Sequence, residues 1–268
     1  MNPGPTFLKA AFSSAALRAN VPAMTTPVTA AAKSELTPTG KLRVGLNHGN
    51  FLLVTPGSSA SDPKEVAPDV ARELAKRLGV PIEFSKFDTA GKLGDAVREG
   101  VWDVAFLGAE PQRAAEIAFT AAYLEIPATY LVPAGSLIRS VDEVDREGVR
   151  IAVADKSAYE LWLSRNIKHA KLMKTQGIDG SFDLFVKEKL EALSGLRPRL
   201  LSDVKKLPGA RILDGVFTAV QQAVGTAKKN ATAAAYLAGF VEDVKASGFV
   251  AEAITRNKSE GVNVAPAR

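Results

Sequence analysis

The sequence contains no cysteine, which excludes disulfide bonds, a thiolate nucleophile and thiolate metal ligands. Histidine is scarce as well: the only two, His48 and His169, lie far apart along the chain and are a poor start for a metal site. The motifs HExxH, GxGxxG, GxxxxGKS/T and GxSxG, which mark common catalytic and nucleotide-binding sites, are missing too. We therefore predict that the protein uses neither a metal nor a cofactor.

Long hydrophobic runs are also missing, since no stretch has the roughly eighteen consecutive apolar residues that span a bilayer. The 268 residues are 46% hydrophobic and 24% charged, which predicts a globular chain with one large or two moderate domains. The net charge is +5, but Lys9, Arg18 and Lys33 precede the first acidic residue, Glu35. The excess that remains is too small to indicate a nucleic-acid partner.

The N-terminal segment, residues 1–36, differs from the rest because it is rich in Ala, Ser, Thr and Pro. We interpret it as a leader or disordered tail outside the fold. Three origins fit: a weak secretory signal cleaved after Ala32, an organelle transit peptide, or a tail that starts at Met24.

The stretch from Trp102 to Phe119 organises the remaining chain. An apolar run, VAFL, predicts a strand buried on both faces, and Gly108 and Pro111 end it. The loop then places Arg113, which we expect to open a helix, beyond the carboxyl end of that strand. Ligands of α/β sheets bind there, and a guanidinium at a helix N-terminus suits a carboxylate. The alternative is a surface ion pair of Arg113 with Glu110 or Glu116.

Strands and helices alternate along the first 120 residues, which predicts a parallel sheet. A second unit of the same kind opens with a strand at residues 149–153 and a tight turn at residues 155–157. Residues 37–130 and 219–268 are predicted to form lobe 1, and residues 131–218 lobe 2. The chain would cross between them near Tyr130 and near Val220, and two crossings make a hinge.

Several stretches, in this order and spacing, resemble the bacterial family 3 extracellular solute-binding proteins: LTPTGKLRVGL, APDVARELAKRLGV, LGDAVREGVWDVAFLGAEPQRAAEIAFTAAY, YLVPAGSLI and GVRIAVADKSAYE. The resemblance implies a type II periplasmic-binding-protein-like α/β fold of two lobes joined by a two-strand hinge. It further implies a periplasmic receptor of a polar amino-acid-type ABC importer, with a small-molecule ligand and a membrane permease as partners. We expect a monomer that closes on its ligand.

The resemblance also assigns site residues. Arg113 matches the arginine that binds the ligand's α-carboxylate, and Ser157 matches a hydroxyl of the second-lobe turn that holds the same group. Two departures surround that turn, because Lys156 replaces a small residue and Ala158 lacks a hydroxyl. The loop after the first strand is predicted to complete the pocket. The predicted ligand-binding set is Arg113, Ser157, Lys156, Ala158, Asn47, His48, Asn50, Phe51, Gly108 and Arg197.

The ligand's ammonium group has no obvious partner in the sequence. Where the family has an aspartate for it, alignment on Glu191 places Leu196, followed by Arg197. An unpaired buried ammonium is costly, so we predict an organic acid, or an acid without a free α-ammonium group. Glu191 or Asp214 could instead restore an ammonium site.

Catalysis is the alternative function, because cyclohexadienyl dehydratase has the same fold. Glu110 and Glu125 are the candidate general acids, although each is more simply a solvated or paired carboxylate. We predict a binding protein and not an enzyme.

Overall fold

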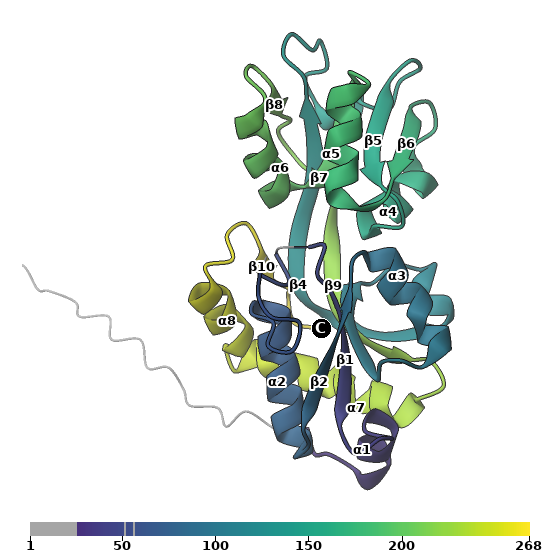
Figure 1. Cartoon of the computed structure of the whole chain (residues 1–268), viewed down its shortest axis with the longest axis vertical. Coiled ribbons are helices and arrows are strands. Elements are labelled where there is room, and N and C mark those ends of the chain that lie inside the picture. The colour runs from purple at the N-terminus through teal and green to yellow at the C-terminus, as the bar shows by residue number, and fades with distance from the viewer. Residues whose placement is uncertain (1–25, 51, 56) are drawn as a thin grey trace, which may run out of the picture.

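The chain folds into two α/β lobes that share one continuous sheet (Figure 1). This computed structural model describes residues 26–50, 52–55 and 57–268. The strands lie in the order β2-β1-β3-β9-β4-β7-β5-β6, and β10 and β8 both pair with β4 beside this path. The long strands β4 and β9 run from one lobe to the other. The predicted fold class, two α/β lobes joined by a two-strand hinge, is confirmed.

Lobe 1 is built on three parallel strands, β1 (Leu42–Asn47), β2 (Ile82–Phe87) and β3 (Val104–Gly108). All five residues of β3 are buried, as expected for a strand covered on both faces. The first helix after β1 buries one stripe, Val70, Leu74 and Leu78, and Gly79 ends it with φ +64°. The helices of this lobe are α2 (Val66–Leu78), α3 (Ala90–Asp95), α7 (Ala231–Ala246) and α8 (Phe249–Asn257).

Lobe 2 repeats the pattern with β5 (Arg150–Ala154), β6 (Lys171–Thr175) and β7 (Ala192–Leu196), which run parallel to one another. Its helices are α4 (Ala158–Asn166), α5 (Gly177–Lys187) and α6 (Arg197–Asp203), and a short strand, β8 (Arg211–Ile212), lies at its edge. In both lobes the carboxyl ends of the parallel strands face the other lobe, so loops from both meet at the hinge (Figure 1).

The hinge strands are β4 (Ile117–Val132) and β9 (Thr218–Ala227), which pair antiparallel. The expectation that Arg113 opens a helix is wrong, because Arg113–Ala115 form a single 3-10 turn that leads directly into β4. The aromatic and β-branched residues that follow favour a strand. A second, two-residue strand, β10 (Asn263–Val264), pairs with β4.

The N-terminal helix α1 (Ala30–Leu36) is part of lobe 1 and packs against α7. Ala32 and Leu36 are fully buried, so the predicted boundary of the fold at residue 36 is too late. The signal-like positions before residue 26, Met24 among them, lie outside the described residues. Cleavage after Ala32 would remove the first turn of this helix. No helix in the described ranges has the length and apolar character needed to cross a membrane.

Candidate functional site

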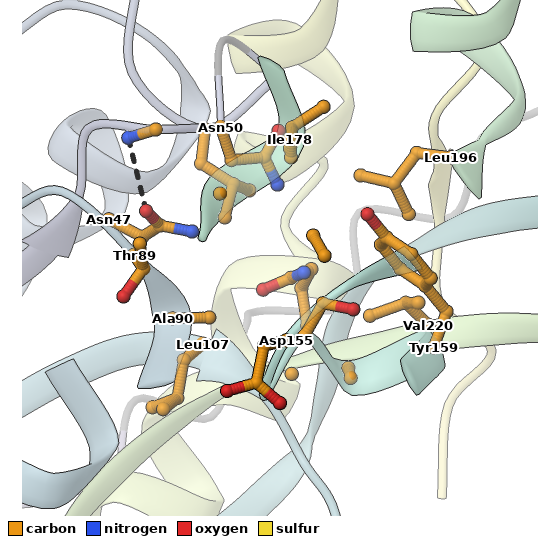
Figure 2. A pocket seen from close by; sticks show the side chains of 18 of the residues that line it. Asn47, Asn50, Thr89, Ala90, Leu107, Asp155, Tyr159, Ile178, Leu196 and Val220 are labelled. Atoms are coloured by element: carbon orange, nitrogen blue, oxygen red, sulfur yellow. Dashed lines mark hydrogen bonds between the residues drawn. The ribbon is translucent and has the colours of Figure 1, made fainter. Parts of the chain in front are cut away.

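A cavity of about 50 Å³ lies between the lobes at the carboxyl ends of β1, β3, β5 and β7 (Figure 2). Each of these strands contributes its last residue to the wall, and these residues are Asn47, Gly108, Ala154 and Leu196. The hinge strand β9 closes one side with Val220 and Gln222. This is the crevice where open α/β sheets bind ligands. The cavity is therefore the candidate binding site.

Arg113 joins the two lobes at one side of this cavity. Its Nη1 donates to the Gly108 carbonyl of lobe 1 at 2.6 Å, and its Nη2 donates to the Lys156 carbonyl of lobe 2 at 2.7 Å. Burial lowers the pKa of Arg113 to about 10, so the guanidinium remains charged at neutral pH. Two of its five N–H groups are occupied by these bonds, which leaves donors for a ligand.

The start of helix α4 faces Arg113 across the cleft. Ser157 is its N-cap, and the Ser157 Oγ accepts from the Glu160 N–H at 3.1 Å. The first-turn N–H groups of Ala158 and Tyr159 have no partner within the helix, as at any helix start. Both residues line the cavity, so the guanidinium and the helix N-terminus lie on the same wall, and groups of this kind favour an anion.

The loop after β1 contributes two asparagines. The Asn47 Oδ1 accepts from the Gly49 N–H, and the Asn50 Oδ1 accepts from the Leu52 N–H, each at 3.1 Å. Figure 2 shows both amide groups directed into the cavity, with the first of these bonds dashed. Asn47 and Asn50 are buried and belong to the predicted set.

Two comparisons identify the chain's relatives. Residues 60–257 match the sequence profile of the bacterial extracellular solute-binding proteins, family 3, and this match covers most of the chain. The chain belongs to this family. No curated protein matches this solute-binding protein significantly in sequence.

Solved structures share the fold of this solute-binding protein at low sequence identity. A mutant of ArgBP from T. maritima is 20% identical, with a TM-score of 0.67, and the alignment covers 85% of this chain and 100% of that one. The solute receptors for L-cysteine of Neisseria gonorrhoeae give 20% identity and a TM-score of 0.69, with 84% and 92% covered. The ancestral amino acid-binding protein AncCDT-1, described as a precursor of cyclohexadienyl dehydratase, is 20% identical with a TM-score of 0.68. That alignment covers 84% of this chain and 98% of AncCDT-1.

The solute-binding protein brings most of the predicted site residues together. Those on the wall of the cavity are Asn47, Asn50, Gly108, Arg113, Ser157 and Ala158. Arg113 forms no ion pair with Glu110 or Glu116, because those carboxylates pair with Arg165 and Arg98. The alternative interpretation of Arg113 as a surface ion pair is therefore wrong.

Three predicted residues lie elsewhere. Lys156 faces a second, wider cavity of about 540 Å³, and its Nζ pairs with Asp95 of lobe 1 at 2.6 Å. His48 does not line the binding cavity, and burial lowers the pKa of its imidazole. The Arg197 guanidinium lies near the Leu213 carbonyl, at 3.4 Å, and away from the cavity. Phe51 lies outside the described residues.

Sequence reasoning missed five polar residues on the wall: Asp88, Thr89, Asp155, Tyr159 and Gln222. Gln222 Oε1 and Tyr159 Oη are buried without a hydrogen-bond partner among the described residues. Burial raises the pKa of the Tyr159 phenol to about 12, so it remains a donor at neutral pH. A signal for Gln222 was available, since two glutamines interrupt the apolar run TAVQQAV.

Leu196 lines the cavity with an apolar side chain at the position where the family resemblance implies an aspartate. Glu191, the proposed substitute, lies at the opposite end of β7 and pairs with Arg150 at 2.8 Å. The cavity wall carries the acceptors Asp88, Asp155 and Gln222. No group of His, Asp and Glu within the described ranges is arranged to hold a metal ion.

The candidate general acids named for catalysis lie off the cavity. Glu110 pairs with Arg165 of lobe 2 at 2.6 Å, and Glu125 lies opposite Asn263 where β4 pairs with β10. Neither belongs to the wall of the site. The carboxylates that do line it are Asp88 and Asp155.

Proposed function

We propose that this solute-binding protein is the receptor of an ABC importer and captures a small ligand that bears a carboxylate, either an amino acid or an organic acid. One observation carries the proposal: Arg113 spans the cleft and faces the N-terminus of α4 from the opposite lobe. A carboxylate placed between them contacts both lobes at once. Its binding therefore stabilises the closed arrangement over an open one.

The energetics favour an anion at this place. A charged donor bound to a carboxylate contributes about 1.5–3 kcal/mol, and the helix N-terminus adds a favourable dipole. Asp88 and Asp155 provide opposite charge elsewhere on the wall, so the cavity suits a ligand whose negative group is localised at Arg113. A ligand with a positive group at Arg113 would be repelled by the guanidinium.

The ligand's amino group is a separate question. The apolar side chain of Leu196 supports an acid without an α-ammonium group, whereas Asp155 and the unpartnered Gln222 Oε1 are acceptors that an ammonium could use. Calorimetry with matched pairs, each an α-amino acid and its deaminated analogue, distinguishes a ligand with an α-ammonium group from one without. Tighter binding of the deaminated partner supports the organic acid.

The carboxylate anchor is tested by replacing Arg113. We expect Arg113→Ala to weaken carboxylate binding by about 10- to 100-fold, the equivalent of one charge-assisted hydrogen-bonding group. The matched control is Arg98→Ala, because Arg98 is exposed, pairs with Glu116 and does not line the binding cavity. Unchanged affinity in Arg113→Ala would show that Arg113 does not bind the ligand's carboxylate.

Transport is tested in the cell of origin. We expect a periplasmic protein that stimulates its permease, and N-terminal sequencing of the native protein shows whether a leader is removed. A thermal-shift screen over metabolites finds the ligand, since a ligand at 100 times its dissociation constant adds about 2.7 kcal/mol of stability. Turnover of prephenate or arogenate in the same samples would establish an enzyme instead.

A further inference from the structure

Asn47 and Asn50 are placed to select the end of the ligand that lies away from Arg113. Arg113 lines both the binding cavity and the wider cavity beside it, so it stands at the junction of the two. The asparagines line only the binding cavity, and they come from the loop after β1, whereas Arg113 comes from the loop after β3. A ligand whose carboxylate lies at Arg113 therefore extends toward the asparagines.

The orientation of both amides is fixed by their surroundings. Each side-chain oxygen accepts a backbone N–H of its own loop, from Gly49 for Asn47 and from Leu52 for Asn50. Rotating either amide by 180° would place an NH2 group against that N–H and lose the bond. The nitrogen, and not the oxygen, must therefore face the cavity, as Figure 2 shows.

These two nitrogens have no other use in the fold. Within the part of the chain that the structure describes, neither Asn47 Nδ2 nor Asn50 Nδ2 donates a hydrogen bond to the protein. The two side chains are 8% and 4% exposed, and a ligand that fills the cavity excludes water from them. A donor that the ligand leaves unmatched then costs about 1–3 kcal/mol. A ligand with an acceptor at this place removes that cost, and one with a cationic or methyl end does not.

We propose that Asn47 and Asn50 select a ligand whose far end carries an oxygen acceptor, a carboxamide or a carboxylate, against one that ends in an ammonium or a methyl group. The inference rests on the proposed function, since it takes the carboxylate at Arg113 as the fixed point. The selection is a difference of affinities: the acceptor end gains two hydrogen bonds, while an ammonium end meets two donors.

Two series of probes with the same five-carbon chain test the end group. The first is L-glutamine, L-glutamate, L-ornithine and L-norvaline; the second, without the α-amino group, is glutaramate, glutarate, 5-aminopentanoate and pentanoate. We expect the tightest binder by calorimetry to be the carboxamide or carboxylate member, by at least tenfold over the others in its series. Equal or tighter binding of an ammonium or methyl member overturns the selection.

Asn47→Asp and Asn50→Asp test the residues. Each substitution keeps the oxygen that accepts the loop N–H and replaces only the donor nitrogen, so the fold should persist, as the melting temperature without ligand checks. We expect each variant to bind the preferred probe at least tenfold more weakly and the ammonium member of that series more tightly. Unchanged preference in both variants overturns the assignment. If none of the eight probes binds the wild-type protein, this selection fails, whereas the carboxylate-ligand proposal fails only if Arg113→Ala leaves the affinity for the screened ligand unchanged.

Discussion

Gly108, the last residue of β3, lies where lobe 1 packs closely against lobe 2. A Cβ atom there would come within 2.7 Å of the Ala158 Cβ of lobe 2 and 3.0 Å of the Val220 Cγ1 of the hinge. Its φ is not in the left-handed region, so alanine would adopt the backbone conformation without strain. A larger side chain at position 108 would therefore clash with the hinge and the other lobe, and not with its own lobe.

We expect Gly108→Ala to hold the lobes slightly apart and to weaken ligand binding by about 5- to 100-fold, since overpacking costs about 1–3 kcal/mol. Calorimetry with the screened ligand measures the change. Gly180→Ala is the control, because its added methyl group meets only ordinary contacts near Thr175 within lobe 2. Wild-type affinity in a folded Gly108→Ala protein would mean that this contact does not limit closure.

The sequence predicts site residues best where they follow a strand. Asn47 and Gly108 were found because the carboxyl ends of parallel strands share one edge, whereas Ser157 was assigned through the family resemblance. Gln222 and Tyr159 were not, because they reach the cavity from the side of the hinge strand and from the first turn of α4. Only the closing of one lobe on the other brings those two faces to the same cavity.

Helix α7 receives an N-terminal cap from another element. The N-cap residue Asn230 makes no capping bond of its own, and the Glu35 carboxylate of α1 accepts from the Ala233 N–H at 2.7 Å. A carboxylate at a helix N-terminus also interacts favourably with the helix dipole. The contact fastens α1 to the helix that it packs against.

We expect Glu35→Ala to lower the free energy of unfolding by about 1 kcal/mol, the usual contribution of an N-cap. Urea denaturation followed by circular dichroism measures it. Glu99→Ala is the matched control, since Glu99 is exposed and makes no side-chain bond within the described residues. Equal midpoints for the two variants would count against the cap.

Two ion pairs join the lobes near Arg113. Asp95 of α3 pairs with Lys156, and both side chains are more than half exposed. Glu110 pairs with Arg165 of α4, and the Glu110 side chain is only 10% exposed. Exposed pairs contribute about 0–1 kcal/mol and are screened by salt, so the more buried pair should matter more.

We expect Glu110→Gln to weaken ligand binding by about fivefold, and Asp95→Asn by about twofold or less, because each pair forms only when the lobes are closed. Calorimetry at low and high salt measures both. A larger effect of Asp95→Asn would reverse this ranking of the pairs.

The helices and strands that the sequence predicts best are those whose apolar residues recur at helical spacing or form a continuous segment. Strand β3 is a continuous apolar run that was predicted from the sequence, and the apolar stripe of α2, ended by Gly79, is typical of a helix. Most of β4 was not predicted, because alanines and Pro127 interrupt its aromatic and β-branched residues. Its identity as a strand depends on pairing with β9 along the hinge, and that contact is not local in the sequence.

At the scale of the whole molecule, the structure has its lobes in contact: Arg113 bonds to both, two ion pairs cross the cleft, and the cavity holds about 50 Å³. Without ligand, these few polar contacts and the packing of Gly108 against Ala158 hold the lobes together, and their sum is small. We therefore expect the free protein to be a more open monomer whose radius of gyration falls on ligand binding, while β4 and β9 bend at the hinge. Small-angle X-ray scattering with and without a saturating ligand measures the change. Superimposable profiles for the two samples would exclude hinge closure as the response to ligand.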